Sequence, residues 1–139
     1  MTTHRPMTEY VLDGSRMTSL EAFFDQFIEI VLGGARWGTN LDAFNDVLRG
    51  GFGTPDGGFI LRWRNSATAR RLLGYPETVR QLELRLEHCH PANRRDVRRA
   101  LSQARRGIGP TVFDWLIEII SVHGPGGVEA EDSVRLILE

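Results

Sequence analysis

Three short apolar segments separated by helical patterns constrain the fold of this 139-residue chain more than any other feature. We expect strands at 9–12, 59–63 and 134–138, because each segment is short and nearly all apolar. Asp13-Gly14 supplies the turn signal that ends the first of them. Strands of this kind that alternate with helices form parallel sheets with helices packed on them. The sequence therefore predicts an α/β fold with a small parallel sheet covered by helices.

The helices expected between the first two strands have clear start and stop signals. In the first helix, apolar residues recur at the spacing of one helical face, and Gly33-Gly34 ends the pattern. Thr18 is the expected N-cap of this helix, with Glu21 reaching back from three residues later. Asn40 is the expected N-cap of a second helix, which a glycine-rich loop ends.

The remaining helices are expected between the second and third strands. Ser66 is the expected cap of a helix through Leu73, Asn93 caps another at 94–106, and a long apolar helix covers 112–122. The stretch 76–89 fits two structures, because its leucines alternate as in a strand while apolar residues also recur at helical spacing behind a proline. We favour a helix at 76–89 and leave the strand open.

Size and composition restrict the class of protein. With 41% hydrophobic residues, the chain is long enough for a single domain over 1–139. Its one cysteine, Cys89, excludes an intramolecular disulfide and a zinc site built from several thiolates. No apolar run approaches the roughly 20 residues that a membrane span needs, and the polar start lacks the apolar region of a signal peptide. We therefore expect a cytoplasmic protein with no membrane partner.

The charges are segregated along the chain. The overall net charge is −1, yet residues 9–58 carry −5, residues 59–110 carry +8 and residues 111–139 carry −5. All 17 basic residues counted as lysine or arginine are arginines. A coding bias explains this usage most simply, and selection for bidentate contacts with anions is the alternative.

The acidic pair Asp42 and Asp46 is the most informative candidate site. The two carboxylates are four residues apart and project from one face of the second predicted helix, opposite its apolar residues. Like charges at this spacing repel and cost the helix about a few tenths of a kcal/mol. Either this face is simply solvated, or it mimics phosphates and docks in a cationic pocket of a partner.

The residues from Trp37 to Leu48 resemble the loop and second helix of the barstar family of ribonuclease inhibitors. The pattern aromatic-Gly-x-Asn-Leu-Asp-Ala-x-x-Asp forms the inhibitory edge in that family, and the likeness covers roughly 9–70 and 110–139. The resemblance implies a three-stranded parallel sheet and an intracellular inhibitor that blocks the active site of a barnase-like ribonuclease with an acidic helix and the preceding loop. It implies a one-to-one complex of the toxin–antitoxin kind, no catalysis and no cofactor.

The resemblance also implies which residues contact the partner. Asp46 matches the central aspartate that enters the phosphate-binding site of the nuclease, and Asp42 matches a second aspartate of that surface. Three positions depart from the family, since Arg36 replaces an aromatic residue, Asn45 replaces an interfacial tryptophan and Gly51 falls near another tryptophan position. Trp37 and Phe52 are the main apolar candidates left nearby. The implied partner-binding residues are Arg36, Trp37, Gly38, Asn40, Asp42, Asn45, Asp46 and Arg49.

Residues 75–110 have no counterpart in the small family member, so we expect an inserted helical hairpin. Its helix 94–106 presents arginines on adjacent turns, which supports an alternative function as a nucleic-acid-binding or regulatory adaptor. These arginines equally fit a solvated face that pairs with neighbouring acids, and no recognised RNA-binding signature accompanies them. A nucleic-acid partner is therefore the less favoured expectation.

Enzymatic chemistry and metal binding are not favoured by the sequence. His88, Cys89 and His90 are consecutive and point in different directions on a helix, so they form neither a metal site nor a nucleophile and base pair. The glycine loop at 50–53 lacks the lysine and hydroxyl residue of a phosphate-binding loop. We expect no enzyme and no bound metal.

Overall fold

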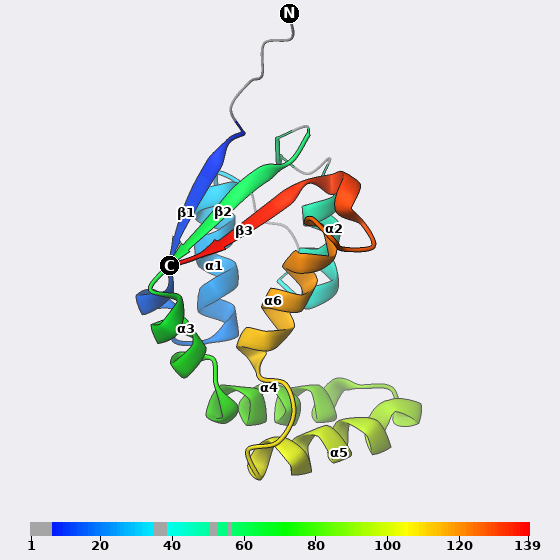
Figure 1. The fold of residues 1–139 in the computed structure, drawn as a ribbon. Helices are drawn as coiled ribbons and strands as arrows, with labels where there is room; N and C mark the ends of the chain where they lie inside the picture. Colours follow the sequence, from blue (N-terminus) through cyan, green and yellow to red (C-terminus); the bar gives the residue numbers. More distant parts are fainter. Residues whose placement is uncertain (1–6, 35–38, 51–52, 56) are drawn as a thin grey trace, which may run out of the picture.

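The computed structural model describes residues 7–34, 39–50, 53–55 and 57–139. β1 (Glu9–Asp13), β2 (Phe59–Arg64) and β3 (Val134–Leu138) form a parallel sheet in the order β1-β2-β3. The three strands lie within a residue of their predicted positions, and the expected α/β fold with a small parallel sheet is confirmed (Figure 1).

Helices cover one face of this sheet. They are α1 (Leu20–Val31), α2 (Leu41–Arg49) and α6 (Val112–Val122), and their aromatic side chains meet the buried face of β2. The ring of Trp63 lies 5.5 Å from Phe23 of α1 and 5.1 Å from Phe113 of α6, measured between centroids. Phe44 of α2 stands edge-on to Phe23 at 5.3 Å. The core therefore fixes α1, α2 and α6 against the central strand.

The opposite face of the sheet is more exposed, because alternate residues of β2 point away from the helices. There Arg62 pairs with Glu9 of β1 and with Glu139 after β3. One cation thus links the three neighbouring chain segments across the open face.

A second group of helices lies beyond one end of the sheet. After α3 (Ser66–Leu72), the helices α4 (Tyr75–His88) and α5 (Arg94–Arg105) pack against each other as a hairpin beneath the N-terminal ends of α1 and α6 (Figure 1). Residues 76–88 are helical, as favoured above, and Cys89 is the C-cap of this helix. This hairpin has its own small core, whose buried members are Leu82, Leu101 and Ala104.

Two buried residues of α4 anchor this hairpin to the main body. Glu77 Oε2 accepts the backbone N–H of Leu20 (2.8 Å), which starts α1, and Thr78 Oγ1 accepts the backbone N–H of Val112 (2.9 Å), which starts α6. The first N–H groups of a helix have no partner within it, so α4 satisfies otherwise orphaned donors of both helices. Trp115 of α6 packs against both apolar clusters and joins them.

Three predicted caps are wrong by one residue or lack the expected contact. Ser19, not Thr18, caps α1, and its hydroxyl accepts the backbone N–H of Ala22. α3 begins after Asn65, whose left-handed backbone makes no side-chain cap, and Ser66 instead donates to the carbonyl of Glu139. Asn93 precedes α5 without a side-chain capping bond.

Within the described residues, no helix is long and apolar enough to cross a membrane.

Candidate partner-binding surface

α2 is amphipathic, and its exposed side carries the predicted aspartates. Phe44, Val47 and Leu48 are buried, whereas Asp42 is exposed and the Asp46 side chain is 50% exposed. Asn40 caps the helix as predicted, since its Oδ1 accepts the backbone N–H of Ala43 (2.8 Å). α2 therefore holds both carboxylates on a rigid element above the core.

The end of α2 is fixed by a glycine and by a network of charges. Gly50 has φ +101°, a conformation that residues with a Cβ rarely adopt. Arg49 Nη1 lies 3.3 Å from Asp46 Oδ1, and its Nη2 lies 3.0 Å from Glu129 Oε1 in the loop before β3. The hydrogen bond to Glu129 and the neighbouring carboxylates raise the pKa of the Arg49 guanidinium. Arg49 thus joins α2 to an acidic loop from the other end of the chain.

A buried histidine lies behind α2. His123, just after α6, is fully buried, with its Nε2 2.6 Å from Asn45 Oδ1 and its Nδ1 2.6 Å from Asp132 Oδ2. Glu129 Oε2 lies 3.3 Å from the same Nδ1. Asn45, which the resemblance implies as a partner contact, therefore directs its side-chain oxygen to a buried partner within the chain.

Acidic side chains from three elements gather on one surface. We name this the acidic surface and define it as Asp42, Asp46, Glu118 and Glu129. Glu118 lies on α6, and it lines a groove of about 390 Å³ together with Asp42 and Glu129. Among the described residues, the side-chain carboxylates of Asp42 and Glu118 have no hydrogen bond and no ion pair. Two carboxylates of this surface therefore lack a cation from the described part of the chain.

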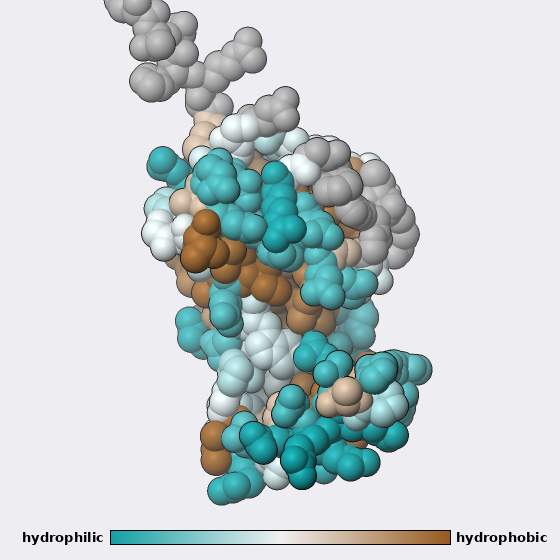
Figure 2. All heavy atoms as spheres, turned by 90° about the vertical axis from the view of Figure 1, so that its right-hand side faces the viewer, coloured by the Kyte–Doolittle hydropathy of each residue, from teal (hydrophilic) through white to brown (hydrophobic). Residues whose placement is uncertain are grey.

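A larger groove borders the same surface. It has a volume of about 840 Å³ and lies between α2 and α4, over side chains of α1 and α6. In Figure 2, apolar side chains in brown lie on the upper body among hydrophilic ones in teal, and a waist separates this body from the lobe of α4 and α5. The two grooves are adjacent, because both are lined by Leu41, Asp42, Glu118 and Ile119.

Five of the eight implied partner-binding residues lie together on or beside α2, whereas Arg36, Trp37 and Gly38 lie outside the described residues. Sequence reasoning did not assign Glu118, Glu129 or His123 to this region. The net charge of −5 over residues 111–139 was a sequence signal for Glu118 and Glu129, and it gave none for His123. Their position against α2 depends on the packing of α6 and the loop that follows it.

The side chains of His123, Glu129 and Asp132 have a spacing that suits a metal ion, with ligand atoms within 4.8 Å of one another. Each of them already has a partner, however, since Asp132 contacts His123 and Glu129 contacts Arg49. The cluster is therefore satisfied by the contact between His123 and Asp132 and by the ion pair between Arg49 and Glu129. His88 and His90 are exposed, and the Cys89 thiol lies 3.8 Å from the carbonyl of Leu86.

Comparison with known protein families identifies one match. The model of the family described as "Barstar (barnase inhibitor)" matches residues 7–106, which include β1, α1, α2, β2 and the α4–α5 hairpin. No individually curated protein matches the chain. The match covers well over half of the sequence, and the α/β fold with its parallel sheet is consistent with a barstar-like fold. The chain belongs to the barstar family, a family of barnase inhibitors.

Proposed function

We propose that this protein inhibits a barnase-like ribonuclease by blocking its active site with α2 and the loop before it. The observation that carries the proposal is the acidic surface, on which Asp42 and Asp46 project from one rigid helix. A ribonuclease must hold a phosphate backbone with cationic groups, and carboxylates at matching positions bind the same groups. The complex is one-to-one, and the inhibitor protects the cytoplasm that contains it.

Asp46 is the central residue in this proposal. Its ion pair with Arg49 is half exposed on both sides, and pairs of this kind contribute only about 0–1 kcal/mol. The carboxylate is therefore able to exchange Arg49 for arginines or lysines of a nuclease at small cost. Once desolvated against them, it becomes a hot spot of the interface.

Replacing Asp46 by Ala is expected to weaken inhibition by at least about thirtyfold, which corresponds to about 2 kcal/mol for a central charged contact. The measurement is RNA cleavage by a barnase-like ribonuclease titrated with the inhibitor at low and moderate salt. Glu29→Ala, which removes an exposed acid from α1, is the matched control and should inhibit like the wild type. Equal effects of the two substitutions would contradict the assigned surface.

The alternative, a nucleic-acid-binding adaptor, depends on α5. Arg105 of α5 pairs with Glu83. Five other arginines, four in α5 and one directly after it, have no ion pair among the described residues. They are Arg94, Arg95, Arg98, Arg99 and Arg106. None of them lines the two grooves beside α2, so this basic face is separate from the acidic surface.

We retain the proposal that 75–110 is an insertion within a single domain 1–139.

A further inference from the structure

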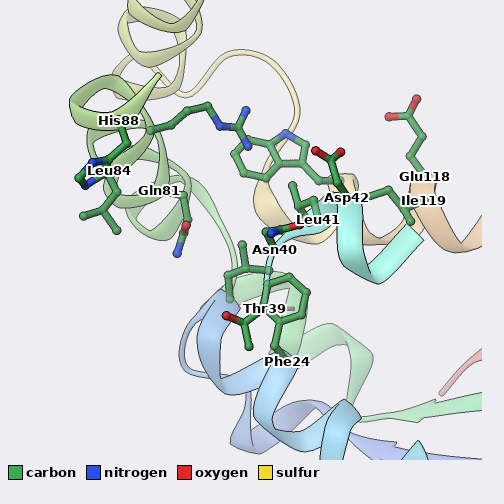
Figure 3. A pocket seen from close by; sticks show the side chains of 13 residues that line it. Phe24, Thr39, Asn40, Leu41, Asp42, Gln81, Leu84, His88, Glu118 and Ile119 are labelled. Atoms are coloured by element: carbon green, nitrogen blue, oxygen red, sulfur yellow. The ribbon is translucent and has the colours of Figure 1, made fainter. Parts of the chain in front are cut away.

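The groove between α2 and α4 has one apolar floor and two sides of different origin. Phe24, Leu41 and Ile119 contribute apolar surface from α1, α2 and α6. Figure 3 shows Asn40 and Asp42 on the side of α2, Gln81, Leu84 and His88 on the side of α4, and Glu118 at the edge. On the α4 side, Leu84 is the apolar residue among polar neighbours, and it is 39% exposed.

The α4 side of the groove is held in a fixed position. Glu77 and Thr78 accept the first N–H groups of α1 and α6, and both residues are buried. Arg80 and Gln81 add further hydrogen bonds from α4 to Glu21 of α1. A surface that is already ordered loses little conformational entropy when a partner binds to it. The groove is therefore suited to recognition as it stands.

The charges in the groove select the chemistry of its occupant. The Arg85 guanidinium lies over the ring of Trp115 at 5.2 Å from its centroid and keeps its positive charge, so Asp42, Glu118 and Arg85 together give the groove lining a net charge of −1. Asp42 and Glu118 carry negative charges that have no ion pair among the described residues. An apolar side chain with a lysine or arginine beside it satisfies both the floor and the edge of the groove.

The groove between α2 and α4 shares a residue with the acidic surface, and this shared residue points to the same partner for both. Asp42 belongs to the acidic surface and also lines this groove, so a protein bound to α2 covers the mouth of the groove at the same time. We propose that α4 forms the second side of the partner-binding surface, and that the groove takes an apolar side chain flanked by a basic one from the same ribonuclease. This inference rests on the proposed function and assigns a role to the segment 75–110.

The test compares Leu84→Ala with Leu138→Ala in ribonuclease inhibition. Both leucines are similarly exposed, at 39% and 42%, but Leu138 ends β3 and lines neither groove. Alanine suits a helix, so Leu84→Ala should fold normally. We expect Leu84→Ala to weaken inhibition about fivefold or more through lost apolar burial, and Leu138→Ala to leave it unchanged.

A second pair of variants tests the charge at the groove. Glu118→Gln is expected to weaken inhibition and to reduce its dependence on salt, whereas Glu29→Gln on α1 should do neither. Amide hydrogen exchange of the complex provides an independent readout, in which residues 81–88 become protected and α5 does not. Protection of both helices, or of neither, would contradict the assigned surface.

The outcomes separate this inference from the proposed function. If the wild type inhibits and Asp46→Ala does not, while Leu84→Ala and Glu118→Gln behave like their controls, the role of α4 is overturned and the function stands. A wild type that does not inhibit overturns both. If Leu84→Ala instead turns a dimer of the free protein into a monomer without changing inhibition, a second copy covers the groove and the inference is wrong.

Discussion

At the scale of single residues, His123 connects the acidic surface to the core. It is buried, and its ring nitrogens lie 2.6 Å from Asn45 of α2 and from Asp132 of the loop before β3. Replacing it by Ala leaves both oxygens without this partner and opens a cavity, and the expected loss is about 1–3 kcal/mol in the free energy of unfolding. Chemical denaturation measures this loss. His88→Ala, at a side chain that is 80% exposed, is the control and should leave stability nearly unchanged.

The same substitution has a functional consequence. Because Asn45 belongs to α2, His123→Ala is expected to weaken ribonuclease inhibition without removing any group of the acidic surface. A variant that loses stability yet inhibits like the wild type at a temperature where it is folded would show that the histidine does not position α2.

At the scale of elements, α4 is a support for α1 and α6, and Glu77 makes this support depend on pH. Burial opposes ionisation of Glu77, but hydrogen bonds from Arg80, the Leu20 N–H and Gln81 outweigh it and lower the pKa of its carboxyl below the ordinary 4.5. A carboxyl with a lowered pKa in the folded state stabilises the protein above its unfolded pKa. This stability is lost as pH falls through the lower folded value.

Glu77→Gln is therefore expected to reduce the free energy of unfolding at neutral pH and to flatten its decline below about pH 4.5. Urea denaturation at several pH values measures both effects. Glu83→Gln, on the exposed side of the same helix, is the control and should retain the acid dependence of the wild type. An unchanged slope in Glu77→Gln would show that other carboxyls set the acid limit.

At the scale of the whole molecule, opposite charges lie on different parts of the surface. The acidic surface is formed by α2, α6 and the loop before β3, whereas the exposed arginines gather on α5. An acidic patch accelerates encounter with a basic nuclease, and salt screens this attraction within about 10 Å at 0.1 M. The arginines of α5 oppose such an encounter.

Neutralising the α5 arginines therefore distinguishes the proposed function from the alternative. With Arg94, Arg95, Arg98 and Arg99 changed to Gln, ribonuclease inhibition is expected to persist and its association rate to stay equal or rise. Stopped-flow association at low and moderate salt measures this rate, and circular dichroism confirms folding. Loss of inhibition in the folded variant would mean that α5 contacts the nuclease. Loss of RNA binding alone would support the adaptor.

Local patterns in the sequence determined most elements of this fold. Apolar periodicity placed β2, α6 and β3 within a residue of their positions, and the run around Asp42 and Asp46 identified the acidic helix and the family. These features depend on neighbours a few residues apart, whose spacing on a helix or strand is fixed by backbone geometry. The cap of α1 was displaced by one residue because Thr18 and Ser19 both suit the role, whereas the cap of α3 failed because the Ser66 hydroxyl donates to the distant carbonyl of Glu139.

Only the tertiary structure decided which surface lies beside α2. Asp42 and Glu118 share a groove although 76 positions separate them, and Glu77 meets the start of α1 across 57 positions. The sequence showed that residues 76–89 could form a helix, but not that this helix would lie across a groove from the aspartates. The reason is that contacts of this range are set by how apolar faces pack and by which buried donors find acceptors. Neither leaves a periodic signal along the chain.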